Sequence, residues 1–203
     1  MEREVTLMEI LDARDRRAQR QRELLGQYAL PLVSFTLNIA GPVKNGTLIR
    51  RAFREGTERL EDALRGESIA IAAREQIDEP TGCEGFFVLR GDGERIKRLC
   101  IALEDEDALG RLFDLDVLDP AQGKWDRTAL GFSERGCLIC GRAGKDCASR
   151  RAHSAAELRE KTAAILRSNF AEKDAQWLAG QAARALPAEV CTTPKPGLED
   201  REK

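Results

Sequence analysis

Two aspartates separated by one residue lie within an apolar segment, GRLFDLDV. Strand side chains alternate between two faces, so Asp114 and Asp116 are expected on one face, where they repel each other unless a cation lies between them. Magnesium prefers carboxylate and phosphate oxygens, and such a pair can bind it to orient a polyphosphate during phosphoryl or nucleotidyl transfer. On spacing alone, a solvated face of an edge strand is the more frequent explanation.

Three further residues are candidates for contacts with phosphate. Arg111 lies on the same predicted strand, residues 111–118, and its forked guanidinium suits phosphate oxygens. Lys44 and Asn45 lie in the turn AGPVKNG, where backbone amides and a nearby lysine can receive phosphate. The alternative for this turn is a plain strand-to-helix connection with an exposed lysine.

Cys137, Cys140, Cys147 and His153, the single histidine of the chain, follow the spacing C-x2-C-x6-C-x5-H. Three thiolates and one imidazole are enough for a closed tetrahedral zinc site. The alternative is that the cysteines are reduced core or surface residues and that His153 caps the next helix. The same segment carries a basic patch that could meet an anionic substrate or partner, formed by Arg142, Lys145, Arg150 and Arg151.

The elements that must position these residues belong to a mixed α/β domain. Thr6 and Glu9 have the spacing of a capping box and predict a helix start. The predicted elements are a helix over 6–25 ended by Gly26, a strand over 32–39, a helix over 47–65, short strands over 68–73, 85–90 and 99–104, the carboxylate strand, a helix from His153 or Ser154 to about residue 170, a helix over 171–186 and an extended tail.

The composition is typical of a folded domain. The chain has 203 residues, of which 42% are hydrophobic and 33% charged, so it can bury a core without disulfides. A net charge of −2 disfavours general nucleic-acid binding. No segment has the roughly 18 apolar residues of a membrane span, and the N-terminus lacks the apolar stretch of a signal peptide. We therefore expect a cytoplasmic protein without membrane partners, whose six cysteines are thiols or metal ligands.

Four blocks of the chain, taken in order, resemble the citrate lyase holo-acyl-carrier-protein synthases, also called apo-citrate lyase phosphoribosyl-dephospho-CoA transferases. The blocks are PLVSFTLNIAGPVKN, TGCEG, LGRLFDLDVLD and RGCLICGRAGKDCASRRAH, within about residues 5–170. The resemblance implies transfer of phosphoribosyl-dephospho-CoA from 2′-(5″-triphosphoribosyl)-3′-dephospho-CoA to a serine of the citrate lyase acyl carrier protein (gamma subunit), with release of pyrophosphate.

The resemblance also implies roles for the candidate residues. Asp114 and Asp116 would bind magnesium and act in catalysis, and Arg111, Lys44 and Asn45 would contact substrate. The expected fold is α/β (α+β), with a mixed central sheet flanked by helices, similar to nucleotidyltransferases, and a helical C-terminus.

The chain departs from the family pattern at two places. Asp107 and Ala108 stand where the family usually has His-Pro, and Cys83 stands where it often has proline. A competing hypothesis is therefore a non-catalytic, zinc-stabilised module that docks the carrier protein or the donor synthase.

The C-terminal segment EVCTTPKPGLEDREK shows a second resemblance, to the opening of triphosphoribosyl-dephospho-CoA synthase, the enzyme that makes the donor. We therefore expect a transferase domain over 1–170. Residues 171–203 are expected to be a helix and extended tail that resemble the start of a fused donor-synthase domain.

Overall fold

A computed structural model describes residues 2–184, apart from the side chains of residues 172 and 175–184. Residues up to Phe170 form one compact unit, and the fold described here is that of this unit. The predicted extended tail and the last residues of the predicted 171–186 helix lie outside the described residues.

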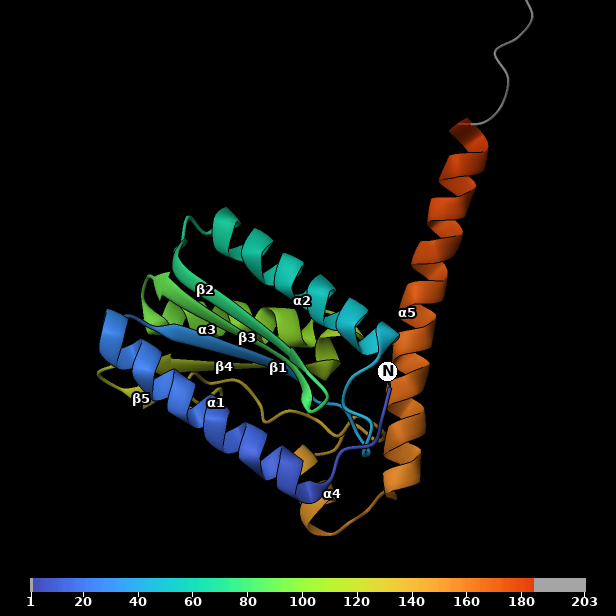
Figure 1. Ribbon diagram of the computed structural model, residues 1–203, viewed down its shortest axis with the longest axis horizontal. Helices are drawn as coiled ribbons and strands as arrows, with labels where there is room; N and C mark the ends of the chain where they lie inside the picture. Colours follow the sequence, from blue (N-terminus) through green and yellow to red (C-terminus); the bar gives the residue numbers. More distant parts are fainter. Residues whose placement is uncertain (1, 185–203) are drawn as a thin grey trace, which may run out of the picture. The chain divides into compact units, whose positions relative to one another are not determined.

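The centre of the unit is a five-stranded sheet with the order β2-β3-β1-β4-β5 (Figure 1). Every described pairing is antiparallel, because tight turns join β2 to β3 and β4 to β5. The expected α/β class with a central sheet and flanking helices is confirmed, but the sheet is antiparallel rather than mixed. The strands are β1 (Leu32–Leu37), β2 (Ala70–Glu79), β3 (Gly82–Arg90), β4 (Phe113–Asp119) and β5 (Gly123–Lys124).

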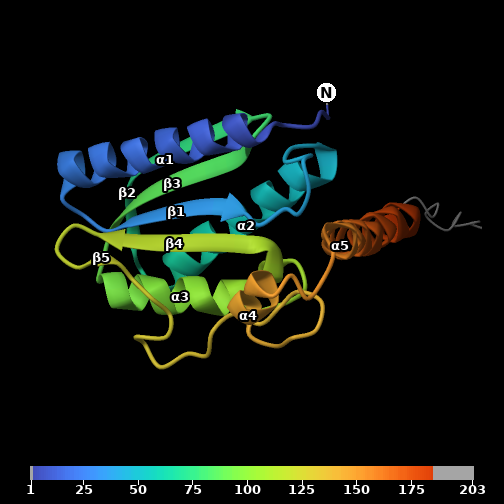
Figure 2. The same ribbon diagram turned by 90° about the horizontal axis from the view of Figure 1, so that it is seen from below.

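Helices cover both faces of the sheet, and Figure 2 shows α1 on one side and α3 on the other. α1 (Leu7–Tyr28) buries Leu24 in a small cluster with strand residues Leu32, Phe86 and Val88. α2 (Thr47–Gly66) and α3 (Gly93–Asp105) cover the opposite face, over the larger core. That core includes Phe35, Phe87, Phe113 and Leu115 of the strands and Ile165, Leu166 and Phe170 of the last helix.

α2 approaches the sheet closely because of Gly56. A Cβ atom at this position would lie 2.5 Å from Cζ of Phe35 and 2.9 Å from Cε1 of Phe113. A glycine inside a helix usually weakens it, but here the missing side chain makes room for two aromatic rings. The close approach fixes the start of β4, which carries the two aspartates.

Two predicted boundaries are wrong. α1 continues through Gly26 and ends at Ala29, which adopts a left-handed conformation with φ 49°. The segment 99–104 is not a strand but the second half of α3. The side chain of Asp92 caps this helix by accepting a hydrogen bond from Arg95 N at 2.9 Å, and the apolar residues of α3 share one buried face at helical spacing.

A single helix, α5 (Ala155–Arg184), covers the two helices predicted at the C-terminal end. Ser154 rather than His153 caps it, because Ser154 Oγ accepts from Glu157 N at 3.1 Å and the Glu157 carboxylate accepts from Ser154 N at 2.8 Å. The capping box predicted for Thr6 and Glu9 is also confirmed.

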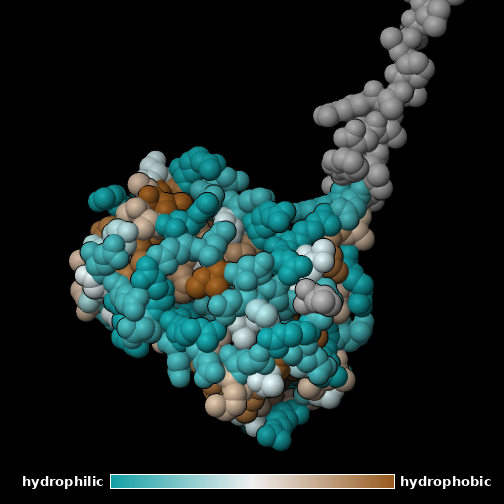
Figure 3. All heavy atoms as spheres, viewed as in Figure 1, coloured by the Kyte–Doolittle hydropathy of each residue, from teal (hydrophilic) through white to brown (hydrophobic). Residues whose placement is uncertain are grey.

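The surface is mainly polar. The face in Figure 3 is largely hydrophilic, with apolar side chains interspersed. Among the described residues, no helix combines the length and the apolar character that crossing a membrane requires. The large apolar side chains that are exposed in this part of the chain are Leu7, Met8, Leu11 and Ile71.

Candidate active site and metal centre

Asp114 and Asp116 lie on the same face of β4. They pair in register with Thr36 and Ser34 of β1. Ser34 Oγ accepts a hydrogen bond of 2.8 Å from Gln21 of α1, so the two carboxylates face the side of the sheet that carries α1. The side chain of Asp114 is 50% exposed and that of Asp116 is 33% exposed. Both carboxylates are therefore open to a ligand.

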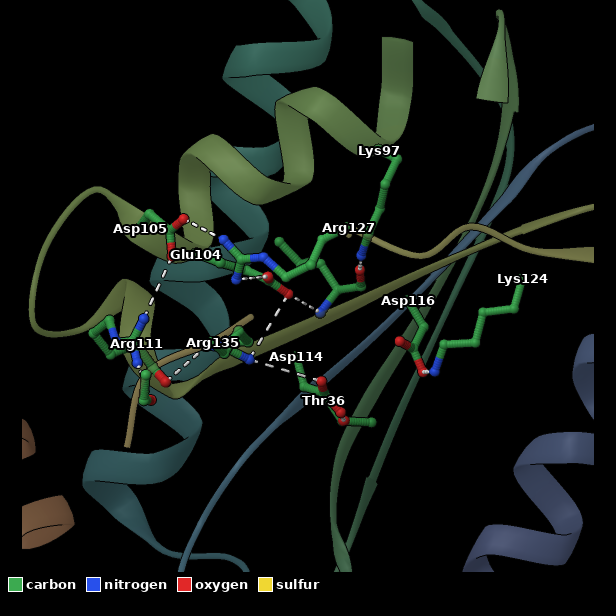
Figure 4. Close-up of polar contacts among 12 residues, drawn as sticks. Thr36, Lys97, Glu104, Asp105, Arg111, Asp114, Asp116, Lys124, Arg127 and Arg135 are labelled. Atoms are coloured by element: carbon green, nitrogen blue, oxygen red, sulfur yellow. Dashed lines mark hydrogen bonds and ion pairs between the residues drawn. The ribbon is translucent and has the colours of Figure 1, made fainter. Parts of the chain in front are cut away.

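Each carboxylate has a cationic neighbour from the segment that follows β4 (Figure 4). Lys124 Nζ lies 2.7 Å from Asp116 Oδ2, and Arg135 Nη1 lies 3.9 Å from Asp114 Oδ1. Thr36 Oγ1 also donates to Asp114 Oδ2 at 3.4 Å. Protein side chains thus supply part of the positive charge that the aspartate pair needs.

The predicted place of Arg111 on the carboxylate strand is wrong, because β4 begins at Phe113. Arg111 belongs to a short 3-10 turn, η1 (Gly110–Leu112), directly before β4. Arg111 Nη2 donates to the carbonyl oxygen of Gly136 at 2.5 Å, and Nη1 lies 3.4 Å from Asp105 Oδ1. Its guanidinium still lines the same cleft as the aspartates.

The two departures from the family pattern occupy defined structural positions. Asp107 accepts a hydrogen bond of 2.7 Å from the first N–H of η1 and pairs with Arg59 at 2.9 Å. Burial opposes ionisation of Asp107, but the hydrogen bonds from Arg59 and from the turn outweigh it and lower its pKa. Cys83 is buried on β3, and this burial raises the pKa of its thiol to about 12. Cys83 is therefore protonated at neutral pH.

α3 contributes two buried charged residues, Lys97 and Glu104. Lys97 Nζ donates to Leu115 O at 2.9 Å, and Glu104 Oε1 accepts from Leu115 N at 2.9 Å. These backbone groups belong to the edge of β4 that β1 does not cover, so the two side chains complete its hydrogen bonding. Burial raises the pKa of Glu104, and the nearby Arg135, the Leu115 N–H and Lys97 oppose that shift.

Two arginines connect Glu104 with the rest of the site (Figure 4). Arg135 Nη1 lies 3.9 Å from Glu104 Oε1, and Arg135 Nη2 donates to Arg111 O at 2.9 Å. Arg127 Nη2 lies 2.5 Å from Asp105 Oδ2, while its Nη1 lies 3.8 Å from Glu104 Oε2. Arg127 Nε and Nη1 are buried without a hydrogen-bond partner among the described residues. The hydrogen-bonding capacity of these buried groups is therefore not used within the described residues.

Sequence analysis missed these four residues. Lys97 and Glu104 lie two helical turns apart on one face of α3, and the strand predicted over 99–104 does not contain this spacing. Arg135 lies two residues before Cys137, the first cysteine of the Cys/His motif, and Arg127 lies in a segment without a recognisable pattern. Their place beside the aspartates results from the tertiary fold.

One cleft of about 860 Å³, here called the main cleft, is lined by Asp114, Asp116, Lys97, Glu104, Lys124, Arg111, Arg127 and Arg135. Apolar side chains line another part of it, among them Trp125, Leu138 and Leu158. This volume lies in the upper part of the range of volumes found for pockets that bind small molecules. The main cleft thus combines paired carboxylates, several guanidinium groups and an apolar surface.

Lys44 and Asn45 lie outside the main cleft. Lys44 lines a smaller pocket of about 300 Å³ that also includes Asp114. Asn45 is buried, and its amide is fully used: Nδ2 donates to Asp78 Oδ1 at 2.5 Å and to Glu79 O at 2.6 Å, and Oδ1 accepts from Arg50 at 3.0 Å. A contact of Asn45 with substrate stays a prediction.

Short local elements bring the Cys/His motif together. A β-bridge between Gly136 and Ala143 closes the turn that holds the first two cysteines. α4 (Gly144–Ser149) carries Cys147, and Arg151 follows in a left-handed conformation with φ 49°. The chain then reaches His153 directly before the cap of α5.

The ligand atoms of Cys137, Cys140, Cys147 and His153 all lie within 4.8 Å of one another. Cys140 Sγ is 3.5 Å from Cys147 Sγ and 3.3 Å from His153 Nε2. Hydrogen bonds, the largest from Arg142 and the next from His153, lower the pKa of Cys140 to about 5. No cysteine among residues 2–184 forms a disulfide. The cluster can therefore hold a metal ion.

The comparison with known families matches residues 5–169 to the model described as apo-citrate lyase phosphoribosyl-dephospho-CoA transferase. The chain belongs to this family. The transferase of that name from Citrobacter koseri is 32% identical over 162 residues, which cover 80% of this chain and 88% of that protein. The resemblance to this family found in the sequence blocks is confirmed.

Two longer relatives match more of the chain. Protein CitXG of Haemophilus influenzae is 35% identical over 199 residues, which cover 97% of this chain and 42% of that protein. Protein CitXG of Leuconostoc mesenteroides subsp. cremoris is 32% identical over 205 residues, 97% of this chain and 44% of that protein. The chain thus spans less than half the length of these two relatives, and its similarity to them includes residues outside the part matched by the Citrobacter enzyme.

Proposed function

We propose that this chain is a nucleotidyltransferase that moves the phosphoribosyl-dephospho-CoA group from 2′-(5″-triphosphoribosyl)-3′-dephospho-CoA to a serine of the citrate lyase acyl carrier protein, with release of pyrophosphate. The observation that carries this proposal is the main cleft, in which Asp114 and Asp116 lie beside arginines and an apolar surface. Membership of the transferase family supports it.

Asp114 and Asp116 suit a magnesium ion. They offer two partly exposed carboxylates on one strand face, with the Thr36 hydroxyl beside Asp114. Magnesium keeps several water ligands and binds proteins through one or two carboxylates together with substrate phosphates. When bound there, it would supply positive charge to offset the charge that develops on the pyrophosphate.

The residues of the main cleft divide the remaining tasks. Arg111, Arg127 and Arg135 offer guanidinium donors to the phosphates, and Arg127 has two N–H groups without a hydrogen-bond partner among the described residues. The serine Oγ forms a bond to the α-phosphorus, the bond from that phosphorus to the bridging oxygen breaks, and its electron pair leaves on pyrophosphate. Asp114 or Asp116 can accept the serine proton.

We also propose that the Cys/His cluster holds zinc in a structural role. Three thiolates and an imidazole form a closed set of four ligands. Zinc bonds of about 2.0–2.3 Å place the ligands of a tetrahedron about 3.5–3.8 Å apart. The separations of 3.3 and 3.5 Å around Cys140 are close to these values.

The proposal also covers the division of the chain into domains and the place of the reaction in the cell. We infer that residues 1–170 form the transferase domain and that residues 171–203 correspond to the start of a donor-synthase domain, which makes the synthase a possible partner. We also propose that the reaction takes place in the cytoplasm.

Transfer can be tested by the mass of the carrier protein. The purified chain, carrier, donor and magnesium are incubated, and the carrier should gain the mass of one phosphoribosyl-dephospho-CoA group. A carrier whose acceptor serine is changed to alanine should gain none. A stable complex without any gain in mass would instead support the non-catalytic, zinc-stabilised docking module.

A further inference from the structure

A second pocket lies next to the main cleft and shares Asp114 and Asn38 with it. It is formed by α1, the end of β1, the Lys44 turn and the turn between β2 and β3, and it has a volume of about 300 Å³. We call it the α1 pocket. Its cationic residues are Arg14, Arg17 and Lys44, and its anionic residues are Glu84 and Asp114.

Two of the three cations in the α1 pocket lack a charged partner. Arg17 Nη1 pairs with Glu84 Oε1 at 2.8 Å. Lys44 Nζ donates at 2.5 Å to the carbonyl oxygen of Ile39, which is neutral. Arg14 is exposed, and the structure gives it neither a hydrogen bond nor an ion pair with any residue of 2–184. The pocket therefore presents positive charge that an anion can neutralise.

The charges of Lys44 and Arg14 act on each other. Lys44 is half-buried, and its pKa is lowered first by this burial and then by the charge of Arg14. Burial also raises the pKa of Glu84, and Arg17 already pairs with this carboxylate. An anion between Arg14 and Lys44 would relieve their repulsion.

We propose that the α1 pocket binds the two terminal phosphates of the donor and holds them as pyrophosphate after transfer. This assignment rests on the proposed function. Asp114 lies where the two pockets meet, so a triphosphate whose α-phosphate is beside Asp114 can extend its other phosphates toward Arg14 and Lys44. A pocket of about 300 Å³ is at the small end of ligand pockets and suits a diphosphate, whereas the main cleft suits the rest of the donor.

This division agrees with the chemistry of the step. The leaving pyrophosphate takes the electron pair of the broken bond, and cations already in place stabilise that charge without reorganisation. In phosphoryl-group transfer the attacking and leaving oxygens lie roughly in line. With pyrophosphate in the α1 pocket, the carrier serine would approach the α-phosphate from the side of the main cleft.

Binding of pyrophosphate in the presence of magnesium tests the assignment without the transfer reaction. Isothermal titration of the full chain should show one binding site, and Arg14→Gln should weaken binding about tenfold or more, the scale of one charge-assisted contact. Lys44→Gln should weaken it similarly. Arg22→Gln, on the same helix, is the matched control: within the described residues Arg22 donates only to the side chain of Gln19, and its loss should leave binding unchanged. Thermal unfolding confirms that each variant is folded.

The outcomes separate the pocket from the reaction. If wild-type protein binds no pyrophosphate, or if both Arg14→Gln and Lys44→Gln bind it as wild type does, the assignment is wrong even when the carrier is modified normally. If binding depends on Arg14 but the carrier gains no mass, the α1 pocket stands as a diphosphate site and the proposed transferase activity fails. If both tests succeed, Arg14→Gln should also weaken inhibition of transfer by pyrophosphate.

Discussion

The two walls of the main cleft are held in place by different means. The wall formed by β4 belongs to the sheet and is joined to α3 through the buried Lys97 and Glu104. The opposite wall, residues 136–153, which we call the knuckle, contains one short helix, and Cys147 is its single buried residue. The comparison indicates that the core of the fold positions the carboxylates, whereas the proposed zinc would stabilise the knuckle.

The largest effect on transfer is expected on the β4 wall. Asp114→Asn or Asp116→Asn should lower the transfer rate by about two orders of magnitude or more, the cost of losing a main electrostatic group. Both variants should remain folded, because each removes one of two carboxylates that repel each other. Carrier mass against time measures the rate, and Asp62→Asn on the exposed side of α2 is the control. Near-normal rates in both variants would contradict the proposed site.

Removal of metal from the knuckle should have a smaller effect on transfer. We expect about one zinc per chain by metal analysis, and chelation or Cys137→Ser should lower transfer about tenfold because the second wall loses its position. Hydrogen exchange should show loss of protection in residues 136–153, while the sheet keeps its protection. Fully active, zinc-free protein would contradict this prediction. Cys100→Ser tests whether loss of a thiol elsewhere, in the core, changes the metal content.

Glu104 provides a test of how the β4 wall is stabilised. Glu104→Ala leaves Leu115 N–H without a partner and should lower the free energy of unfolding by about 2–3 kcal/mol. Glu104→Gln keeps an acceptor for that N–H and should change it by less than about 1 kcal/mol. Urea unfolding of both variants measures the difference. Equal losses would show that the charge, and not the hydrogen bond, is what matters.

The raised pKa of Glu104 predicts that the stability of the fold depends on pH. The pKa of Glu104 is raised in the folded state, so the folded chain binds more protons than the unfolded chain between the two pKa values. The contribution of Glu104 to the free energy of unfolding is therefore most favourable below the ordinary pKa of 4.5. It declines as pH rises through the raised pKa of the folded state. Glu104→Gln should remove this decline, which is seen by comparing the unfolding of both proteins over a pH series.

The smallest effect is expected from the C-terminal residues. A chain that ends at Leu186 should match the full chain in thermal stability and in transfer rate, because residues 187–203 lie beyond every block that resembles the transferase. Both are measured side by side with the full chain. A clear loss of either would place part of the active protein in this segment.

Local patterns predicted the parts of the site that depend on local geometry. Alternation along residues 113–117 placed the two aspartates on one face, because strand periodicity needs no tertiary information. The cysteine and histidine spacing was sufficient to predict their convergence. In contrast, Asn45 is buried and donates hydrogen bonds to Asp78 and to the carbonyl oxygen of Glu79, which are distant in the sequence. No local pattern contains those contacts.

The hydrogen bonds that Lys97 and Glu104 make with the backbone of Leu115 also affect how β4 can pair with strands of other molecules. Beyond the short β5, the strand is an open edge, and open edges recruit strands from other molecules into aggregates. Here the outward N–H and C=O of Leu115 are already bonded to side chains of the same unit. A foreign strand therefore cannot extend the sheet at this point. A protein partner would have to bind this edge through side-chain contacts, and the chain can keep an accessible site there without polymerising through it.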